Sequence, residues 1–182
     1  MRPGRKGALA VALVLALALV GLAGCGNTLG TQGSEGEPIQ LGDLKINVSE
    51  TRFLNPSQPD DGQYLEGQKV PLPSSQAYLG VFLTMHNTSD HAVPVPTNGQ
   101  MNVVDTTGAA YASIPSHTPF AAPLGTTLAG GGDVPAPDSA AANGPTQSAL
   151  VLFLVAQGST ENRPLKLEIA YAGENGEITL DI

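Results

Sequence analysis

The chain has 182 residues, with 8 basic (Lys and Arg) and 16 acidic (Asp and Glu) side chains and a formal net charge of −8. This balance argues against nucleic-acid binding and against electrostatic adhesion to anionic lipid, because both need basic patches. The single cysteine permits no intrachain disulfide, so a folded domain must be stable on its core alone.

The N-terminal segment has the layout of a secretory signal peptide. Arg2, Arg5 and Lys6 precede an uncharged run over residues 8–24 that consists mostly of Ala, Val and Leu. A short basic start, an apolar stretch and small residues at its end are typical of such peptides. The run of 17 residues is at the lower edge of what spans a bilayer, so a permanent transmembrane anchor is the alternative. We therefore assign residues 1–24 to a signal peptide that is removed.

The apolar run ends at Leu22-Ala23-Gly24-Cys25, which resembles the lipobox of bacterial lipoproteins. The resemblance implies cleavage before Cys25 and a diacylglycerol on its sulfur. An odd cysteine in an exported protein calls for such an explanation. Removal of residues 1–24 leaves five basic side chains against 16 acidic ones, a net charge of −11. Membrane attachment must therefore come from the lipid, whose acyl chains suffice for stable anchoring.

Residues 25–42 are predicted to be the lipidated cysteine followed by a flexible linker. Residues 26–37 contain four glycines and one aliphatic residue, a composition typical of a flexible tether. Such a stretch reaches about 20 Å, which would hold a domain clear of the lipid headgroups.

Segments after residue 43 are predicted to be β-strands, because apolar residues alternate with polar ones or form short runs bounded by turn residues. In chain order these segments are 44–54, 76–87, 93–95, 101–105, 109–114, 146–156, 165–169 and 178–182. Segments 76–87 and 146–156 carry apolar residues on both faces, so we expect both to be central strands that are covered on both sides. Segments 55–75 and 115–145 are rich in Pro and are predicted to be irregular loops.

The spacing of these segments, without an amphipathic helix between them, predicts an all-β fold. We expect an antiparallel β-sandwich of seven to eight strands that forms one domain over residues 43–182. A closed barrel is the alternative, because the number of strands does not separate the two architectures.

Two short motifs point to a group of known domains. The strand 78–83 is followed by the polar turn Asn87-Thr88-Ser89-Asp90, and residues 104–111 have the pattern apolar, Asp, x, x, Gly, x, x, Tyr. Together they resemble the immunoglobulin-like domains of unknown function on bacterial surface lipoproteins, a group related to a secreted mycobacterial-type antigen. The resemblance covers residues 44–182 and implies an immunoglobulin-like sandwich on the outer face of the membrane. It implies no catalytic or ligand-binding residues.

Met85, His86, His91, Met101 and His117 are of the residue types that bind copper. Met85 and His86 are neighbours on a predicted strand, so they point to opposite faces and cannot share one ion without a bulge. We expect Met85 in the core, and His91 and His117 in loops that face solvent. No metal site is therefore predicted.

Acidic side chains and nucleophiles suggest no further site. Asp60-Asp61-Gly62, and Asp133 with Asp138, could contribute calcium ligands. The sequence has no complete calcium-loop pattern, so we expect these acids to form turns. It also lacks the motifs Gly-x-Ser-x-Gly, Ser-x-x-Lys and His-Glu-x-x-His. We therefore expect no enzyme activity and no cofactor.

The sequence leads to one functional hypothesis and one alternative. The first is a monomeric, non-catalytic module on the extracytoplasmic face of a bacterial cell membrane, anchored by the lipid on Cys25, that binds an envelope protein or serves envelope assembly. The alternative is a small-ligand or metal-binding lipoprotein that serves a transporter or a redox partner. A binding module is expected to expose an apolar patch or a sheet edge, and a carrier to have a closed pocket with convergent polar groups.

Overall fold

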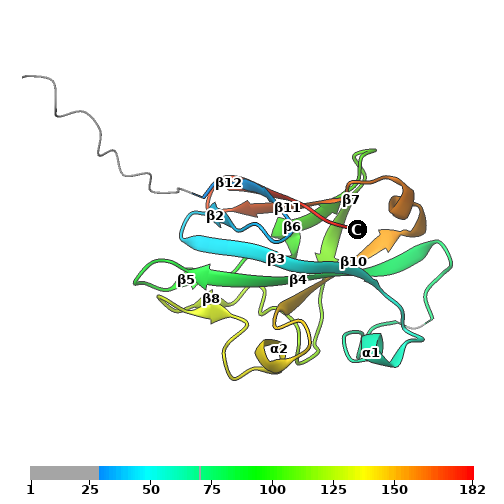
Figure 1. Cartoon of the computed structure of the whole chain (residues 1–182), viewed down its shortest axis with the longest axis horizontal. Coiled ribbons are helices and arrows are strands. Elements are labelled where there is room, and N and C mark those ends of the chain that lie inside the picture. The colour runs from blue at the N-terminus through cyan, green and yellow to red at the C-terminus, as the bar shows by residue number, and fades with distance from the viewer. Residues whose placement is uncertain (1–28, 70) are drawn as a thin grey trace, which may run out of the picture.

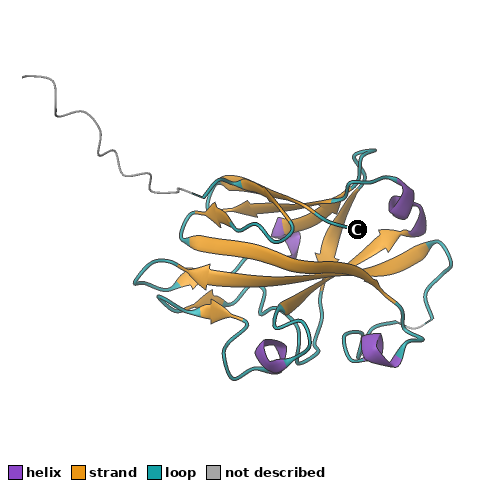
Figure 2. Cartoon of the chain, in the orientation of Figure 1, coloured by secondary structure: helices purple, strands orange, loops and turns teal. Residues whose placement is uncertain are grey.

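The computed structural model describes residues 29–69 and 71–182, which fold into two packed layers of β-strands (Figures 1 and 2). The first layer contains β1 (Gln32–Ser34), β12 (Glu174–Thr179), β11 (Lys166–Tyr171) and β6 (Met101–Val104). The second layer contains β2 (Ile39–Leu41), β3 (Leu44–Leu54), β4 (Gln76–Asn87), β10 (Ala149–Ala156) and the short β9 (Asp133–Val134). Neighbouring strands are antiparallel in both layers, except that β1 runs parallel to β12.

Strand β7 (Ala110–Ile114) connects the two layers. Its first three residues pair with β6, and its last two, Ser113 and Ile114, pair with β10. The strand order is therefore continuous, β1-β12-β11-β6-β7-β10-β4-β3-β2. The remaining elements are the two-stranded sheet of β5 (Val93–Pro94) and β8 (Thr127–Leu128), the short helices α1 (Pro59–Gly62) and α2 (Ala140–Asn143), and the 3-10 helices η1 (Asn98–Gln100) and η2 (Gln157–Glu161).

The all-β sandwich expected from the sequence is confirmed. Each predicted segment overlaps a strand, and the predicted segment 76–87 matches β4 at both ends. The last segment, 178–182, was placed too late in the chain, because β12 already begins at Glu174 and ends at Thr179. The predicted segments 101–105 and 109–114 form the hairpin of β6 and β7, and Gly108 in its turn has a φ of +85°, which suits glycine. The Pro-rich segment 115–145 is mostly irregular, as predicted, and adds β8, β9 and α2.

The predicted linker over residues 25–42 is wrong in its second half. Residues 32–34 form β1 beside β12, and residues 39–41 form β2 beside β3. Ile39 and Leu41 are fully buried. Strands of three residues are too short to show an alternation of apolar and polar side chains. In addition, β1 pairs with β12 through its backbone, which the glycine-rich sequence does not indicate. The folded domain thus begins before residue 43.

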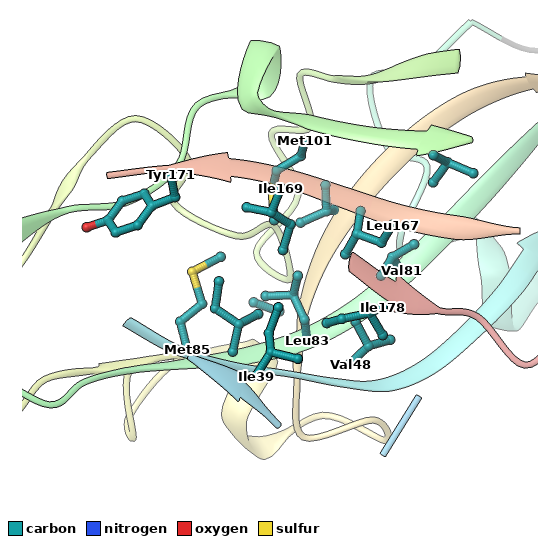
Figure 3. Close-up of a cluster of buried hydrophobic side chains, with 14 of the residues drawn as sticks. Ile39, Val48, Val81, Leu83, Met85, Met101, Leu167, Ile169, Tyr171 and Ile178 are labelled. Atoms are coloured by element: carbon teal, nitrogen blue, oxygen red, sulfur yellow. The ribbon is translucent and has the colours of Figure 1, made fainter. Parts of the chain in front are cut away.

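The main hydrophobic core lies between the two layers. One face of β4 contributes Leu79, Val81, Leu83 and Met85, which pack against apolar residues of the opposite layer. Figure 3 shows Met85 and Leu83 facing the side chains of Ile169 and Leu167 on β11. The alternation read from the sequence therefore identified the inward face of this strand.

A second hydrophobic cluster covers the outer faces of β4 and β10. Its buried members are Leu54, Tyr64, Leu65, Tyr78, Phe82, Leu150 and Leu152. The segment that contains α1 supplies Tyr64, whose ring meets the ring of Phe82 edge to face, with 5.1 Å between the centroids. Arg52 lies over both rings and forms an ion pair with the buried Asp61. The two central strands are therefore buried on both faces, as their sequences predicted.

Within the described residues, no helix has the length and apolar character needed to cross a membrane. The predicted signal peptide, the alternative transmembrane anchor and Cys25 all lie outside the described residues.

Candidate functional site

Turns from separate parts of the chain meet at one end of the sandwich and border a groove of about 500 Å³. The polar and aromatic groups around it include Asp43, His91, Pro94, Thr97, Gln100 and Tyr171. They come from the β2–β3 turn, the connection from β4 to β5, the segment around η1, and the end of β11. We call this site the loop-end groove. Its volume lies within the range of small-ligand pockets, roughly 300–1,000 Å³.

The wall that carries His91 is held in place by the fully buried Asn87. The Asn87 side-chain amide donates to the backbone oxygens of His91 at 2.7 Å and Ala129 at 2.9 Å. Its side-chain oxygen accepts from the backbone N–H of Ser89 at 3.0 Å and from the Ser89 hydroxyl at 2.8 Å. The Asn-Thr-Ser-Asp motif of the sequence is therefore a turn-building element, since its side chains satisfy backbone groups.

Tyr171 forms the inner boundary of the groove. The residue is only 6% exposed, and its hydroxyl donates to the backbone oxygen of Pro94 at 2.8 Å. Burial raises the pKa of Tyr171, and the negative charge of Asp43 raises this pKa further. Asp43 and Tyr171 both line the groove.

The rim of the groove is acidic. The Nε2 atom of His91 lies 3.4 Å from a carboxylate oxygen of Asp43, and its Nδ1 atom lies 3.5 Å from Asp90. The His91 side chain is 64% exposed and that of Asp43 48%. Among the described residues that line the groove there is no Lys or Arg. The rim can therefore attract a cationic group without competition from a Lys or Arg in the lining.

Thr97 and Gln100 give the groove a rigid polar corner. The side-chain oxygen of Gln100 accepts from the backbone N–H of Thr97 at 2.9 Å and from the Thr97 hydroxyl at 3.0 Å. These contacts form a capping box at the start of η1. Both residues are therefore held before any ligand arrives.

The residues considered for copper lie in separate places. Met85 and Met101 are buried in the main core, as expected for Met85. His86 faces outward and contacts Asp133, with 2.8 Å between Nδ1 and Oδ1, while the exposed His117 borders a smaller hollow of about 250 Å³ beside β10. Among residues 29–69 and 71–182, no group of three or more His, Cys, Asp or Glu is arranged to hold a metal ion.

The acidic residues considered for calcium have structural partners. Asp61 is buried against Arg52 and also accepts from the backbone N–H of Asn55 at 2.8 Å. Asp133 contacts His86, and Asp138 is exposed next to the N-terminus of α2. Turns were expected for these acids, whereas Asp61 lies in α1 and is held by its ion pair with Arg52.

The apolar-Asp-x-x-Gly motif also has a structural role. The Asp105 carboxylate accepts from the Thr107 hydroxyl at 2.6 Å, from the Thr107 N–H at 2.8 Å and from the Ala109 N–H at 3.1 Å. The Thr107 hydroxyl, followed by these backbone donors, lowers the pKa of Asp105 despite partial burial of the carboxyl. The motif closes the β6–β7 turn.

The loop-end groove was not predicted from the sequence. Asp43, Gln100 and Tyr171 lie far apart in the chain and belong to no short motif, so no local pattern could bring them together. The Pro-rich segment 115–145 contributes Gly125 to the groove.

No protein-family model and no curated protein matches this sequence. Solved structures do match in fold. MPT63, a secreted protein from Mycobacterium tuberculosis, is 15% identical with a TM-score of 0.52, over 83% of this chain and 96% of that one. The yjhA protein from Bacillus subtilis is 12% identical with a TM-score of 0.52, over 82% of this chain and 99% of that one.

A candidate lipoprotein, ycdA from Bacillus subtilis, is 12% identical with a TM-score of 0.50, over 81% of this chain and 39% of that one. At such identities these likenesses show a shared fold. The β-sandwich fold that was expected from the resemblance to a secreted mycobacterial-type antigen is thus confirmed.

Proposed function

We propose that this protein is a lipid-anchored, extracytoplasmic β-sandwich module that binds a cationic segment of an envelope protein at the loop-end groove and performs no catalysis. The location is supported by the lipobox resemblance at Cys25 and by the fold that the chain shares with a secreted protein and a candidate lipoprotein. The single observation that carries the binding role is the groove, where distant turns bring Asp43, His91 and Tyr171 together.

The groove suits a basic side chain of a partner better than it suits an apolar one. Asp43 in the lining and the neighbouring Asp90 supply negative charge, and Asn87 fixes the turn that carries Asp90 and His91. Among the described residues, Leu29 is the large hydrophobic residue that is exposed. The described surface therefore shows no patch of large apolar side chains of the kind expected for a binding module. Charge and shape at the groove are therefore the basis of the proposal.

The proposal assigns no catalytic role to the imidazoles of His86 and His91. His86 contacts Asp133, and His91 contacts Asp43 and Asp90. Activation of a hydroxyl nucleophile needs a base within hydrogen-bond reach. Within residues 29–69 and 71–182, no hydroxyl group forms a hydrogen bond to either ring.

Photo-crosslinking on intact cells tests the binding role. A photoreactive residue at the exposed Ala92 in the groove should crosslink an envelope protein, and one at the exposed Thr106 at the opposite end should not. Asp43→Asn should weaken the crosslink from position 92, while Glu161→Gln, a matched loss of charge far from the groove, should leave it unchanged. Equal crosslinking from both positions would contradict a groove-specific partner.

Fractionation of cells that express Cys25→Ser tests the anchor. We expect the wild-type protein in the membrane fraction and the variant in the soluble extracytoplasmic fraction. A variant that stays membrane-bound would exclude lipid on Cys25 as the anchor.

A small-ligand carrier is the second candidate, because about 500 Å³ suits a small molecule. The charge of the rim again favours a cation. Isothermal titration of the soluble Cys25→Ser protein with spermidine as the probe separates the two. Saturable binding that Asp43→Asn abolishes would favour the carrier, while lack of heat together with a specific crosslink would favour the protein partner.

A further inference from the structure

The described chain begins at a fixed position in the fold. The backbone oxygen of Gly30 accepts from the N–H of Gln40 at 3.0 Å, and that of Thr31 accepts from the N–H of Glu177 at 2.9 Å. Residues 30 and 31 are thus bound on one side to β2 and on the other to β12. The starting point of the domain is therefore set by both layers.

This starting point lies at the groove end of the sandwich. Gln40, which binds Gly30, donates through its side-chain amide to the backbone oxygen of Gly42 at 2.7 Å and to the Thr88 hydroxyl at 3.4 Å. Gly42 lines the groove, and its N–H donates to Glu174 after the β11–β12 turn at 2.7 Å. Figure 1 shows the blue start of the chain at the left of the view, on the same side as β5 and β8.

The chain between Cys25 and Gly30 is short. Five residue steps of at most about 3.6 Å span no more than about 18 Å. The headgroup region occupies roughly 5–8 Å on each side of a bilayer. The β-sandwich is much longer than this reach, because the 12 residues of β4 extend over about 40 Å.

We propose that the groove end of the sandwich faces the bilayer surface and that the opposite end, with the β6–β7 turn and η2, points away from it. This inference rests on the proposed lipid on Cys25. It makes the loop-end groove a membrane-proximal site, so its partner must reach it from the membrane side.

The side chains at the groove end of the sandwich are mostly acidic, so attraction to anionic lipid does not explain the orientation. Asp43, Asp90, Asp133 and Glu174 lie there, with Lys45 as the nearby basic side chain of β3. Anionic lipids attract basic segments, and acidic groups are repelled by the same field. The short chain to Cys25, and not attraction to lipid charge, therefore holds this end near the membrane.

Depth-dependent fluorescence quenching tests the orientation. The lipidated full chain, labelled at Ala92→Cys or at Thr106→Cys, is placed in phosphatidylcholine vesicles that contain a headgroup spin-labelled lipid. We expect quenching at position 92 to be several-fold stronger than at position 106. Equal quenching, or stronger quenching at position 106, on vesicle-bound protein would overturn the orientation.

Two further experiments test the role of the short chain after Cys25 and the lipid anchor itself. Insertion of about twelve Gly and Ser residues after Gly26 adds roughly 20 Å of reach, so it should reduce the difference between the two labels; an unchanged difference would overturn the role of the short chain. Vesicle sedimentation of the Cys25→Ser protein reports on the anchor separately. If wild-type and variant sediment alike, the anchoring premise fails, whereas anchored protein with equal quenching refutes the orientation alone.

Discussion

The carboxylate of Glu35 accepts a hydrogen bond from the backbone N–H of Thr51 at 3.0 Å, which ties the segment between β1 and β2 to β3. Its second oxygen accepts from the backbone N–H of Asp181, also at 3.0 Å. Thr51 belongs to the second layer, and Asp181 follows β12 of the first. One side chain before residue 43 therefore links both layers of the sandwich.

Replacing Glu35 with Ala should destabilise the domain by about 1–2 kcal/mol, because two backbone donors lose a charged acceptor. Urea denaturation of the purified protein measures this change. Glu37→Ala is the matched control, since Glu37 accepts one exposed hydrogen bond from Ser34 at 3.1 Å. A control that loses as much stability as the Glu35 variant would show that the link between layers does not matter.

A chain that starts at Asp43 should be much less stable than one that starts at Leu29. It lacks Ile39 and Leu41, which are fully buried, and each such side chain contributes about 1.5–3 kcal/mol. Leu41 packs closely over Gly176, since a Cβ built at Gly176 would lie 2.7 Å from Leu41 Cδ1. Loss of Leu41 therefore also exposes this part of β12. Thermal unfolding followed by circular dichroism compares the two chains. Equal midpoints would restore the flexible-linker interpretation of residues 29–42.

Asp105→Ala should destabilise the protein at neutral pH and remove part of its acid sensitivity. The carboxyl has a lowered pKa in the folded state, so its contribution is present above about pH 4, the ordinary value for Asp, and is lost as the pH falls through the folded-state pKa. Asp105→Asn keeps an acceptor for Thr107 and Ala109 and should retain more stability, without this titration. Denaturation curves at neutral and acidic pH measure both effects. An acid dependence in Asp105→Asn equal to wild type would contradict the assignment.

Tyr171→Phe should cost about 1 kcal/mol at neutral pH, because the hydrogen bond to Pro94 is lost. The raised pKa of Tyr171 means that the unfolded state deprotonates first, so wild-type stability is retained below about pH 10 and falls above it. The variant should lose less stability on this alkaline side. Some alkaline loss should remain, because burial also raises the pKa of Tyr78. Urea denaturation on both sides of this pH measures the difference.

Gly80→Ala tests the packing of the second cluster. A Cβ at this position would lie 3.1 Å from both Leu150 Cδ1 and Leu54 Cδ1, so we expect a loss of about 1–3 kcal/mol from overpacking. Gly99→Ala is the control, because its Cβ would meet no atom within 4 Å. Thermal unfolding of both variants gives the comparison. Equal stability of the Gly80 variant and wild type would mean that the outer cluster yields easily.

The strands were predictable where their side chains repeat over several residues. In β4 and β10 the apolar residues occupy both faces, and this pattern correctly indicated strands buried on both sides. In contrast, β1 and β2 have three residues each. Their positions depend on backbone partners in β12 and β3, which the local sequence does not specify.

In the candidate site, too, residues within local motifs were identified from the sequence, and residues that meet only in the fold were not. The sequence singled out Asn87 and Asp105 within short motifs, and both proved to build turns. Tyr171 carried no motif, yet it forms the inner boundary of the loop-end groove. The groove depends on contacts between residues that are distant in the chain, such as Tyr171 with Pro94.

The sequence by itself determined the all-β class and the inward faces of the long strands, because each depends on residues close together in the chain. Lipidation of Cys25 stays a prediction from the sequence, since this residue lies outside the described part of the chain. The tertiary structure alone decided that residues 32–41 belong to the domain and that Asp43, His91 and Tyr171 meet at one end. The physical reason is that both features are made by hydrogen bonds and packing between layers, and these contacts exist only once the two layers have come together.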